Sequence, residues 1–394
     1  MSDCASDTET FRGATRETVR AALSSDDALP GTTGFAGELD GIVVRDVLGR
    51  EPLYVESASA RTNSMPTAEP SAETSTKWAF EPTALENPTL LPAGSTLALD
   101  DPDATPEQYF DLPEPTPESN HSRALTRLET AIETAADAVD TDDRDIAVAF
   151  SGGVDSALVA AVLDAPLYVV GFPDSHDVEA ARSAARAMGR ELTVVELEPT
   201  DLERAVPEVA RATGRTNAMD VQIALPLYLV GERVAADGFD ALAVGQGADE
   251  LFGGYEKVVR LDHRVEANTV RGAVREGIET LPAQLPRDVH AIEATGLDPV
   301  APLLHDTVVD AALRLPDELL ADETERKRAL RRVSRSHLPA DVVDREKKAV
   351  QYGSLVAREL DRLARQAGYK RRMDDHVGTY IRSLLENEPD PPSA

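Results

Sequence analysis

The strongest constraint on the fold is a regular alternation of short apolar runs with helical patterns, which begins near residue 121. Each run is short and mostly apolar, as suits a strand that is buried on both faces of a parallel sheet. The runs are 145–150, 166–172, 191–197 and 240–245. Strands that alternate with helices predict an α/β fold with a doubly wound parallel sheet. The last third, 256–388, is expected to be mostly helical.

The first third of the chain has a different character. Residues 34–55 and 77–100 predict short strands separated by turns, and the Ser-, Thr-, Ala- and Pro-rich segment 56–76 between them predicts a flexible loop. Prolines and acidic residues dominate 101–120, which is typical of a linker. We therefore expect a small β-rich domain over 1–100, a linker over 101–120 and a larger α/β domain over 121–388.

The charge balance excludes one class of function. The 394 residues include 71 Asp and Glu against 40 Lys and Arg, a net charge of −31. Such a surface repels phosphate, so a non-specific nucleic-acid binder with a basic surface is excluded and no DNA partner is expected. Only 6 of the cations are lysine and 34 are arginine. This composition favours a halophilic, salt-adapted protein, although a merely acidic protein that avoids aggregation remains the alternative.

Cysteine and apolar content limit the chemistry and the location. The single cysteine, Cys4, excludes an internal disulfide framework and a cysteine-based zinc site. No stretch of 18 apolar residues occurs, and the first residues lack the pattern of a signal peptide. We expect a cytoplasmic protein with no membrane contact.

The strongest local motif is Phe-Ser-Gly-Gly-Val-Asp-Ser at 150–156, between an apolar strand and the start of a helix. Gly152 and Gly153 allow the backbone to approach a ligand, and the amides of the first helical turn favour an anion. No Gly-Lys-Ser/Thr follows, so the loop is not a Walker A loop. Asp155 would repel a phosphate unless a cation intervened, which makes it a candidate Mg²⁺ ligand. The alternative is an ordinary tight turn in which the aspartate caps the helix.

Two further motifs carry candidate chemistry. Residues 245–255, Gly-Gln-Gly-Ala-Asp-Glu-Leu-Phe-Gly-Gly-Tyr, follow another apolar strand and suit a second contact with metal and phosphate. Residues 345–348, Arg-Glu-Lys-Lys, concentrate three cations in four positions. A cation there could stabilise charge on a leaving phosphate, and surface ion pairs are the alternative.

These motifs together resemble the synthetase domain of the asparagine synthetase family, which belongs to the N-type ATP pyrophosphatases. The resemblance covers about 121–365 and includes two later segments, 290–316 and 344–354. It implies an adenine nucleotide alpha hydrolase-like fold, with Mg²⁺ held by Asp155 and Asp249, pyrophosphate contacted by Lys347 and the adenine bound near Gly171. The residues that it assigns to the ATP phosphates are Ser151, Gly152, Gly153, Asp155 and Ser156. Gly245 and Gly247 in the second motif are further candidates for cofactor binding.

The chemistry that the resemblance implies needs ATP and Mg²⁺ but no protein nucleophile. A substrate carboxylate attacks the α-phosphate, pyrophosphate leaves, and an amine displaces AMP to form an amide. Gln246 stands where the family usually has Glu. A glutamine cannot take a proton from ammonia, but it could position the intermediate by hydrogen bonding. With the Gln-Tyr-Gly-Ser ending at 351–354, this change resembles the archaeal and eukaryotic asparagine-synthetase-like branch.

The N-terminal region resembles the second half of a class II glutaminase domain. The matching segments are 45–54, 78–82 and 90–94. Such glutaminases need an amino-terminal cysteine whose α-amine acts as a base. Because Cys4 lies behind three residues and no matching Asn-Gly segment is present, we expect a truncated scaffold.

The leading hypothesis is an ATP-dependent carbon–nitrogen ligase, most simply one that converts aspartate to asparagine with free ammonia or an external nitrogen donor. Another adenylating reaction on a different carboxylate or a nucleoside is one alternative. A non-catalytic nucleotide-binding protein is the other. The sequence leaves a homodimer open.

Overall fold

The computed structural model describes residues 10–56, 76–101, 103–139, 144–261, 263–345 and 353–386. These residues form two compact units, each built from three stretches of chain. Unit 1 comprises the described residues within Met1–Ala138, Gln246–Pro286 and Ala301–Val333. Unit 2 comprises those within Val139–Gly245, Arg287–Val300 and Ser334–Ala394.

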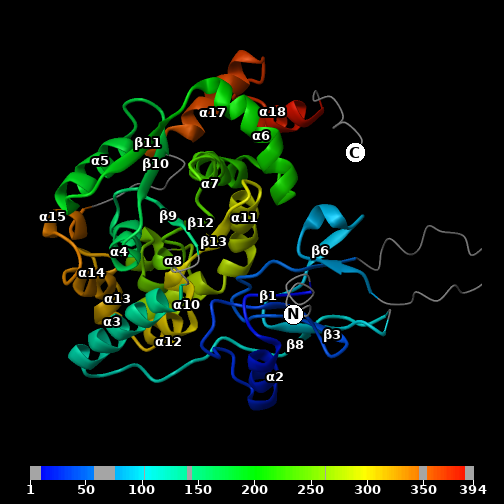
Figure 1. The fold of residues 1–394 in the computed structure, drawn as a ribbon, viewed down its shortest axis with the longest axis vertical. Coiled ribbons are helices and arrows are strands. Elements are labelled where there is room, and N and C mark those ends of the chain that lie inside the picture. The colour runs from blue at the N-terminus through cyan, green and yellow to red at the C-terminus, as the bar shows by residue number, and fades with distance from the viewer. Residues whose placement is uncertain are drawn as a thin grey trace, which may run out of the picture. The chain divides into compact units, whose positions relative to one another are not determined.

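Unit 2 contains a sheet of five parallel strands (Figure 1). In spatial order they are β11 (Leu192–Glu196), β10 (Leu167–Gly171), β9 (Ile146–Ala149), β12 (Ala241–Ala243) and β13 (Asp298–Val300). Strands β10 and β12 are buried along their length, and β9 is buried except at Ala149, because helices cover the sheet. The doubly wound parallel sheet predicted from the alternation is therefore confirmed, with four of its strands inside the predicted runs.

Two groups of helices pack on this sheet. In the first group, α5 packs on β10 and β11, α4 packs on β9, and α15 contacts both helices. In the second group, α7 packs on β9, β10 and β12, and it is covered in turn by α6, α17 and α18. The first group is α4 (Val154–Leu163), α5 (His176–Met188) and α15 (Ala340–Val343), and the second is α6 (Pro199–Thr213), α7 (Ala218–Ala236), α17 (Val356–Gln366) and α18 (His376–Glu386). Within the described ranges, no helix combines the length and the apolar character needed to cross a bilayer.

The fifth strand lies in the last third of the chain, 256–388, which is expected to be mostly helical. It pairs with β12, with Pro299 opposite Leu242. A three-residue strand is too short to show a period, and its central proline argues against a strand interior. Proline is tolerated at this position because β13 is the edge strand of the sheet. The rest of the described chain after residue 256 is mostly helical, as predicted.

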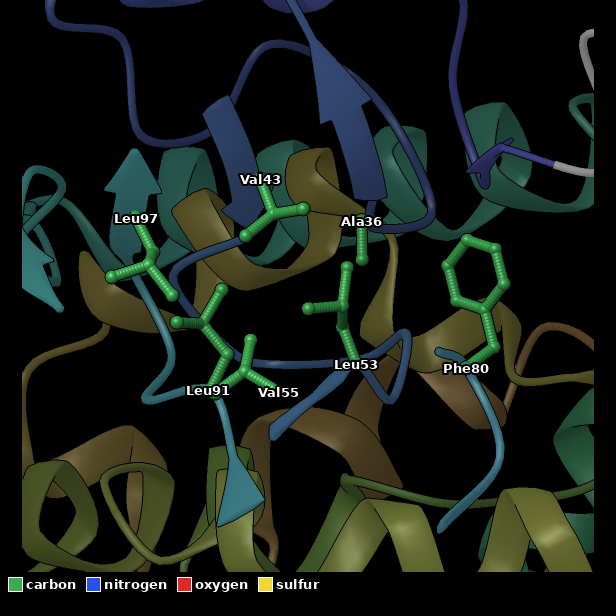
Figure 2. Packing of buried hydrophobic residues seen from close by; sticks show 7 residues of the cluster. All are labelled: Ala36, Val43, Leu53, Val55, Phe80, Leu91 and Leu97. Carbon is green, nitrogen blue, oxygen red and sulfur yellow. The ribbon is translucent and has the colours of Figure 1, made fainter. Parts of the chain in front are cut away.

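Unit 1 contains two small antiparallel sheets. The first has the order β1 (Phe11–Arg12), β2 (Ala36–Leu39), β3 (Ile42–Arg45), β7 (Ser95–Ala98) and β8 (Glu107–Gln108). The second has the order β5 (Trp78–Ala79), β4 (Tyr54–Glu56) and β6 (Pro88–Leu90). Figure 2 shows buried side chains of both sheets and their connections packed into one cluster, namely Ala36, Val43, Leu53, Val55, Phe80, Leu91 and Leu97. β8 lies within the segment 101–120 and adds to the edge of the first sheet through β7.

Helices complete unit 1. Helix α12 packs on α3 and α8, and α10 packs on α8, α9 and α13. The helices are α2 (Arg16–Ser25), α3 (His121–Asp137), α8 (Ala248–Phe252), α9 (Glu256–Arg260), α10 (Val270–Ile278), α12 (Asp306–Leu313) and α13 (Asp317–Leu320), with the short 3₁₀ turns Pro82–Ala84 and Pro302–Leu304. The division of the chain into units falls inside two further helices, α11 (Leu281–Glu293) and α14 (Arg328–Ser334).

A buried ionic cluster joins the β-rich part of unit 1 to its 301–333 stretch. The Arg50 guanidinium lies 2.8 Å from a carboxylate oxygen of Asp46 and 2.7 Å from one of Asp306, and it donates to the carbonyl oxygen of Leu304 at 2.7 Å. Asp306 also accepts from the backbone N–H and the hydroxyl of Thr32. The side chains of Arg50, Asp46 and Asp306 are at most 4% exposed. One guanidinium thus bridges two carboxylates away from water.

Candidate functional site

The order of the strands in unit 2 defines where a ligand would bind. The chain moves from β9 to β10 and β11 toward one edge, and from β12 to β13 toward the other. The order therefore reverses between β9 and β12. Open α/β sheets bind ligands beyond the carboxyl ends of the strands at such a switch point. The motif at 150–156 follows β9 and Gly245 follows β12, so both lie at this position.

At Gly152, the loop after β9 packs so closely on α5 that no side chain would fit. Gly152 has a φ of +72°, and a Cβ atom there would lie 2.6 Å from the carbonyl carbon and oxygen of Ala180 in α5. Gly153 is the N-cap residue of α4 and provides no side-chain hydrogen bond to the helix. The N-terminal amides of α4 are therefore not covered by a cap side chain. A helix start of this kind favours a phosphate group.

The two serines of the loop hydrogen-bond to each other. The backbone N–H of Ser151 donates to the Ser156 hydroxyl at 3.1 Å, and the two hydroxyl oxygens are 3.0 Å apart. Ser156 is only 4% exposed, whereas Ser151 is half-buried. In this structure the buried Ser156 hydroxyl stabilises the turn by its hydrogen bonds with Ser151. Its assignment to the ATP phosphates stays a prediction, as does that of Ser151.

Gly245 brings the end of β12 against the start of α4. A Cβ atom at Gly245 would lie 2.9 Å from Cβ of Asp155 and 3.0 Å from the backbone nitrogen of Ser156. Since real Cβ atoms are almost never this close to other atoms, only glycine permits the contact. Unit 2 thus brings two predicted residues, Gly245 and Asp155, into direct contact.

The carboxyl end of β10 is equally crowded. Gly171 is the last residue of β10, and a Cβ atom there would lie 2.6 Å from the hydroxyl oxygen of Ser175. Ser175 is the N-cap residue of α5 and accepts from the backbone N–H of Val178. Gly171 thus ends its strand as predicted, and its contact with adenine stays a prediction.

The described residues near the two ends of the segment 344–354 contact this part of unit 2. Arg345 donates to the carbonyl oxygen of Ala180 and, at 2.9 Å, to the hydroxyl of Ser183, both in α5. On the other side, the Ser354 carbonyl accepts from the Phe172 backbone N–H at 3.2 Å. Lys347 lies outside the described residues, since 346–352 are not among them.

The second motif is divided between the units. Gly245 belongs to unit 2, whereas Gln246–Tyr255 belong to unit 1. In unit 1, Gly247 is the N-cap residue of α8 with a φ of +82°, and a Cβ atom there would lie 2.3 Å from a methyl carbon of Leu304. Asp249, in the first turn of α8, lies 2.7 Å from the Lys327 ammonium. Gln246 is half-buried.

The acidic residue next to Asp249 has a different environment. Glu250 is 6% exposed and accepts a hydrogen bond from the Tyr255 hydroxyl. Burial raises the pKa of Glu250 above its ordinary value of 4.5, and the Asp249 carboxylate raises it further, while the hydrogen bond from Tyr255 lowers it. The buried Glu250 therefore stabilises the turn through its hydrogen bond with Tyr255. The Asp249 side chain is 45% exposed, so its carboxylate is the one that a ligand can reach.

Each predicted magnesium ligand, taken within its own unit, is of a type that accepts magnesium together with a nucleotide. In the part of the chain that the structure describes, no three His, Cys, Asp or Glu side chains gather as a closed metal site. Mg²⁺ is usually held by one or two carboxylates, with phosphate oxygens and water completing its shell. Asp155 in unit 2 and Asp249 in unit 1 are carboxylates of this kind, and their joint role as ligands stays a prediction.

Sequence reasoning missed Lys327 and the purpose of the glycine pair 253–254. The available signal was the scarcity of lysine, because a chain with 34 arginines and 6 lysines keeps lysine at few positions. The ion pair of Lys327 with Asp249 spans 78 positions in the sequence, so no local motif contains it.

Comparisons with known proteins agree with the motifs. A family described as asparagine synthase matches residues 127–278 and 274–387, well over half of the chain. A Methanocaldococcus jannaschii protein, provisionally named as a glutamine-hydrolyzing asparagine synthetase, is 28% identical over 278 residues, which cover 61% of this chain and 51% of that protein. Asparagine synthetase B (glutamine-hydrolyzing) of Escherichia coli is 24% identical over 227 residues, 52% of this chain and 41% of that protein.

The chain thus spans about half of the length of the first relative and 41% of the second. Among solved structures, the U34-tRNA thiolase NcsA of Methanococcus maripaludis is 12% identical and covers 68% of this chain and 82% of its own, with a TM-score of 0.29. That score is too low to support an inference.

Proposed function

This chain belongs to the asparagine synthase family, and from that premise we propose that it is an ATP-dependent carbon–nitrogen ligase. It adenylates a carboxylate, most simply that of L-aspartate, and converts it to an amide with release of AMP and pyrophosphate. The names of the relatives support asparagine as the product.

One observation carries the proposal. At the switch point of the unit 2 sheet, Gly245 presses against Asp155 and Ser156 where α4 begins. Gly152 keeps the other side of the loop against α5. A phosphate chain could therefore approach backbone amides without meeting side chains, as binding at a helix N-terminus requires.

The roles that we propose for the remaining predicted residues follow the family motifs. Asp155 and Asp249 would ligate Mg²⁺, which would neutralise phosphate charge during the reaction. Lys347 would contact the departing pyrophosphate, and Gly171 would lie beside the adenine. Gln246 would position the acyl intermediate through its carboxamide.

The proposed reaction balances without a covalent bond to the protein. A carboxylate oxygen of the substrate forms a bond to the α-phosphorus of ATP, and the bond to pyrophosphate breaks. Ammonia then attacks the acyl carbon, and AMP leaves with that carboxylate oxygen. The proton that the nitrogen loses goes to a group other than Gln246, because a neutral carboxamide is not a base near pH 7. The chain contributes binding and orientation.

We propose that residues 1–100 act as a scaffold. Residues 101–120 would form the linker, and residues 121–388 would form the synthetase-like domain. The cluster of Arg50 with Asp306 supports this role, because it ties the β-rich part to the 301–333 stretch of the same unit. Cys4 lies outside the described residues. The nitrogen would then come from free ammonia or an external donor.

The test is asparagine formation from L-aspartate, ATP, ammonium and Mg²⁺ at high salt, with AMP measured in parallel. Asp155→Asn should lower the rate roughly 100-fold because a carboxylate ligand is lost. Asp164→Asn is the matched control, since Asp164 ends the same helix and its side chain is 95% exposed. Formation of ADP and phosphate, or full activity of D155N, would contradict the proposal. A Cys4→Ala variant that lost glutamine-dependent activity would overturn the scaffold role.

A further inference from the structure

In the ion pair of Lys327 with Asp249 in unit 1, the lysine side chain is far more buried than the aspartate side chain. The Lys327 side chain is 10% exposed, while the Asp249 carboxylate that it contacts is 45% exposed. The ammonium lies 2.7 Å from one carboxylate oxygen, Oδ1. Lysine is among the residues that are almost never fully buried unless they are paired. The cation thus holds the carboxylate from the interior and leaves it accessible from outside.

The glycine of the adjacent turn makes room for this pair. A Cβ atom at Gly254 would lie 1.8 Å from Oδ1 of Asp249 and 2.4 Å from Cε of Lys327. The backbone N–H of Gly254 donates to the Asp249 carbonyl at 2.8 Å, and Arg326 donates to the Gly254 carbonyl at 3.1 Å. The turn is therefore built around the ion pair, and this explains the second glycine of the motif.

The residue type and the backbone conformation at position 327 also indicate that this ion pair has a specific role. Lys327 has a φ of +57°, a conformation that costs free energy in a residue with a side chain. The chain uses arginine for 34 of its 40 cations but keeps lysine at this position. A slender stem with a compact charge fits beside Gly254, whereas a planar guanidinium would pair with the carboxylate in a different geometry.

We propose that Lys327 is a positioning residue that holds Oδ1 of Asp249, so that the carboxylate presents its other oxygen to Mg²⁺. The inference rests on the proposed function, in which Asp249 is a metal ligand. Partners that fix a ligating carboxylate typically change metal affinity by about 10–100-fold when they are removed. A lysine that served only to join α8 to the 327 turn would change stability without changing metal affinity.

The experiment measures Mn²⁺ binding to the full chain by electron paramagnetic resonance, with ATP present and at high salt. Variants are Lys327→Met, Asp249→Asn and the double variant, and Lys370→Met, at an exposed lysine, is the matched control. We expect K327M and D249N each to weaken binding about 10–100-fold, the double variant to be no weaker than D249N alone, and K370M to bind as the wild type does. Circular dichroism and thermal melting establish that each variant is folded.

The outcomes separate the two proposals. If D249N binds Mn²⁺ as tightly as the wild type, the metal role of Asp249 in the proposed function fails. If D249N is weakened but K327M is not, or if K327M binds more tightly, the positioning role alone is overturned. If K327M does not fold, Lys327→Arg decides, because it keeps the charge but moves the contact. Its affinity should fall several-fold, and unchanged affinity would overturn the inference.

Discussion

Replacing Gly245 with alanine would disturb the contact between β12 and α4 by a predictable amount. The new Cβ atom would lie 2.9–3.1 Å from atoms of Asp155 and Ser156, which falls short of an ordinary contact of 3.4 Å by up to about 0.5 Å. The φ at Gly245 is outside the left-handed region, so the cost is steric only. Overpacking costs about 1–3 kcal/mol, and the lower entropy of the unfolded chain offsets about 0.4–1 kcal/mol. We expect a net loss of about 1–2 kcal/mol.

The same displacement should reduce nucleotide binding. Misplacement by 1 Å can cost a factor of about 100 in rate, so half of that should raise the KM for ATP roughly tenfold. Denaturant unfolding and the KM for ATP test this prediction. The control is Gly277→Ala, where the nearest neighbour is at 3.8 Å in ordinary contact and the helical position favours alanine. Unchanged stability and unchanged KM in G245A would refute the geometry on which the proposed nucleotide site depends.

Three further predictions test other parts of the structure. Gly152→Ala should destabilise the chain by about 2–4 kcal/mol, because it combines a positive φ with a clash against the α5 backbone. Gly189→Ala, at a similar φ with no atom within 4 Å, should cost only the conformational part in a thermal melt. Arg50→Met leaves Asp306 buried without its cation and should cost about 3–5 kcal/mol in urea unfolding, and a loss below about 1 kcal/mol would contradict the role of the cluster. Burial lowers the pKa of His305 below its ordinary value of 6.5. As the pH falls through 6.5, this histidine is protonated in the unfolded chain before it is protonated in the folded chain, so the free energy of unfolding decreases. His305→Asn keeps a cap residue for α12 and should flatten that dependence in melts across this range, whereas an unchanged slope would contradict it.

Much of unit 2 could be predicted because its signals are local. Each buried strand is a short apolar run, and each glycine-rich loop follows such a run directly in the sequence. The parallel sheet then places the ends of β9 and β12 beside each other. The contact of Gly245 with Asp155 is a consequence of that pairing.

The remaining features depend on long-range contacts. β13 is three residues long and contains Pro299, so its strand character comes from pairing with β12. The division of the second motif between two units is not visible in a continuous stretch such as 245–255. The ion pair of Lys327 with Asp249 requires the chain to return after 78 residues.

In the N-terminal region, the strands could be predicted from the sequence, but a buried ion pair could not. Short strands within 34–55 and 77–100 are confirmed by β2–β7. The pairing of Arg50 with its second buried partner, Asp306, could not be predicted, because Asp306 lies 256 residues further along the chain. Charges inside a core are satisfied by whatever partner the fold supplies, and sequence spacing does not identify that partner.

The central claim is that this chain opens ATP between its α- and β-phosphates by forming an acyl-adenylate. The most direct measurement uses L-aspartate labelled with ¹⁸O in its side-chain carboxylate, together with ATP, Mg²⁺ and ammonium, and analyses the nucleotide product by mass spectrometry. The mechanism predicts AMP that carries one ¹⁸O atom from the carboxylate for each asparagine formed. Unlabelled AMP, or ADP in place of AMP, would contradict it.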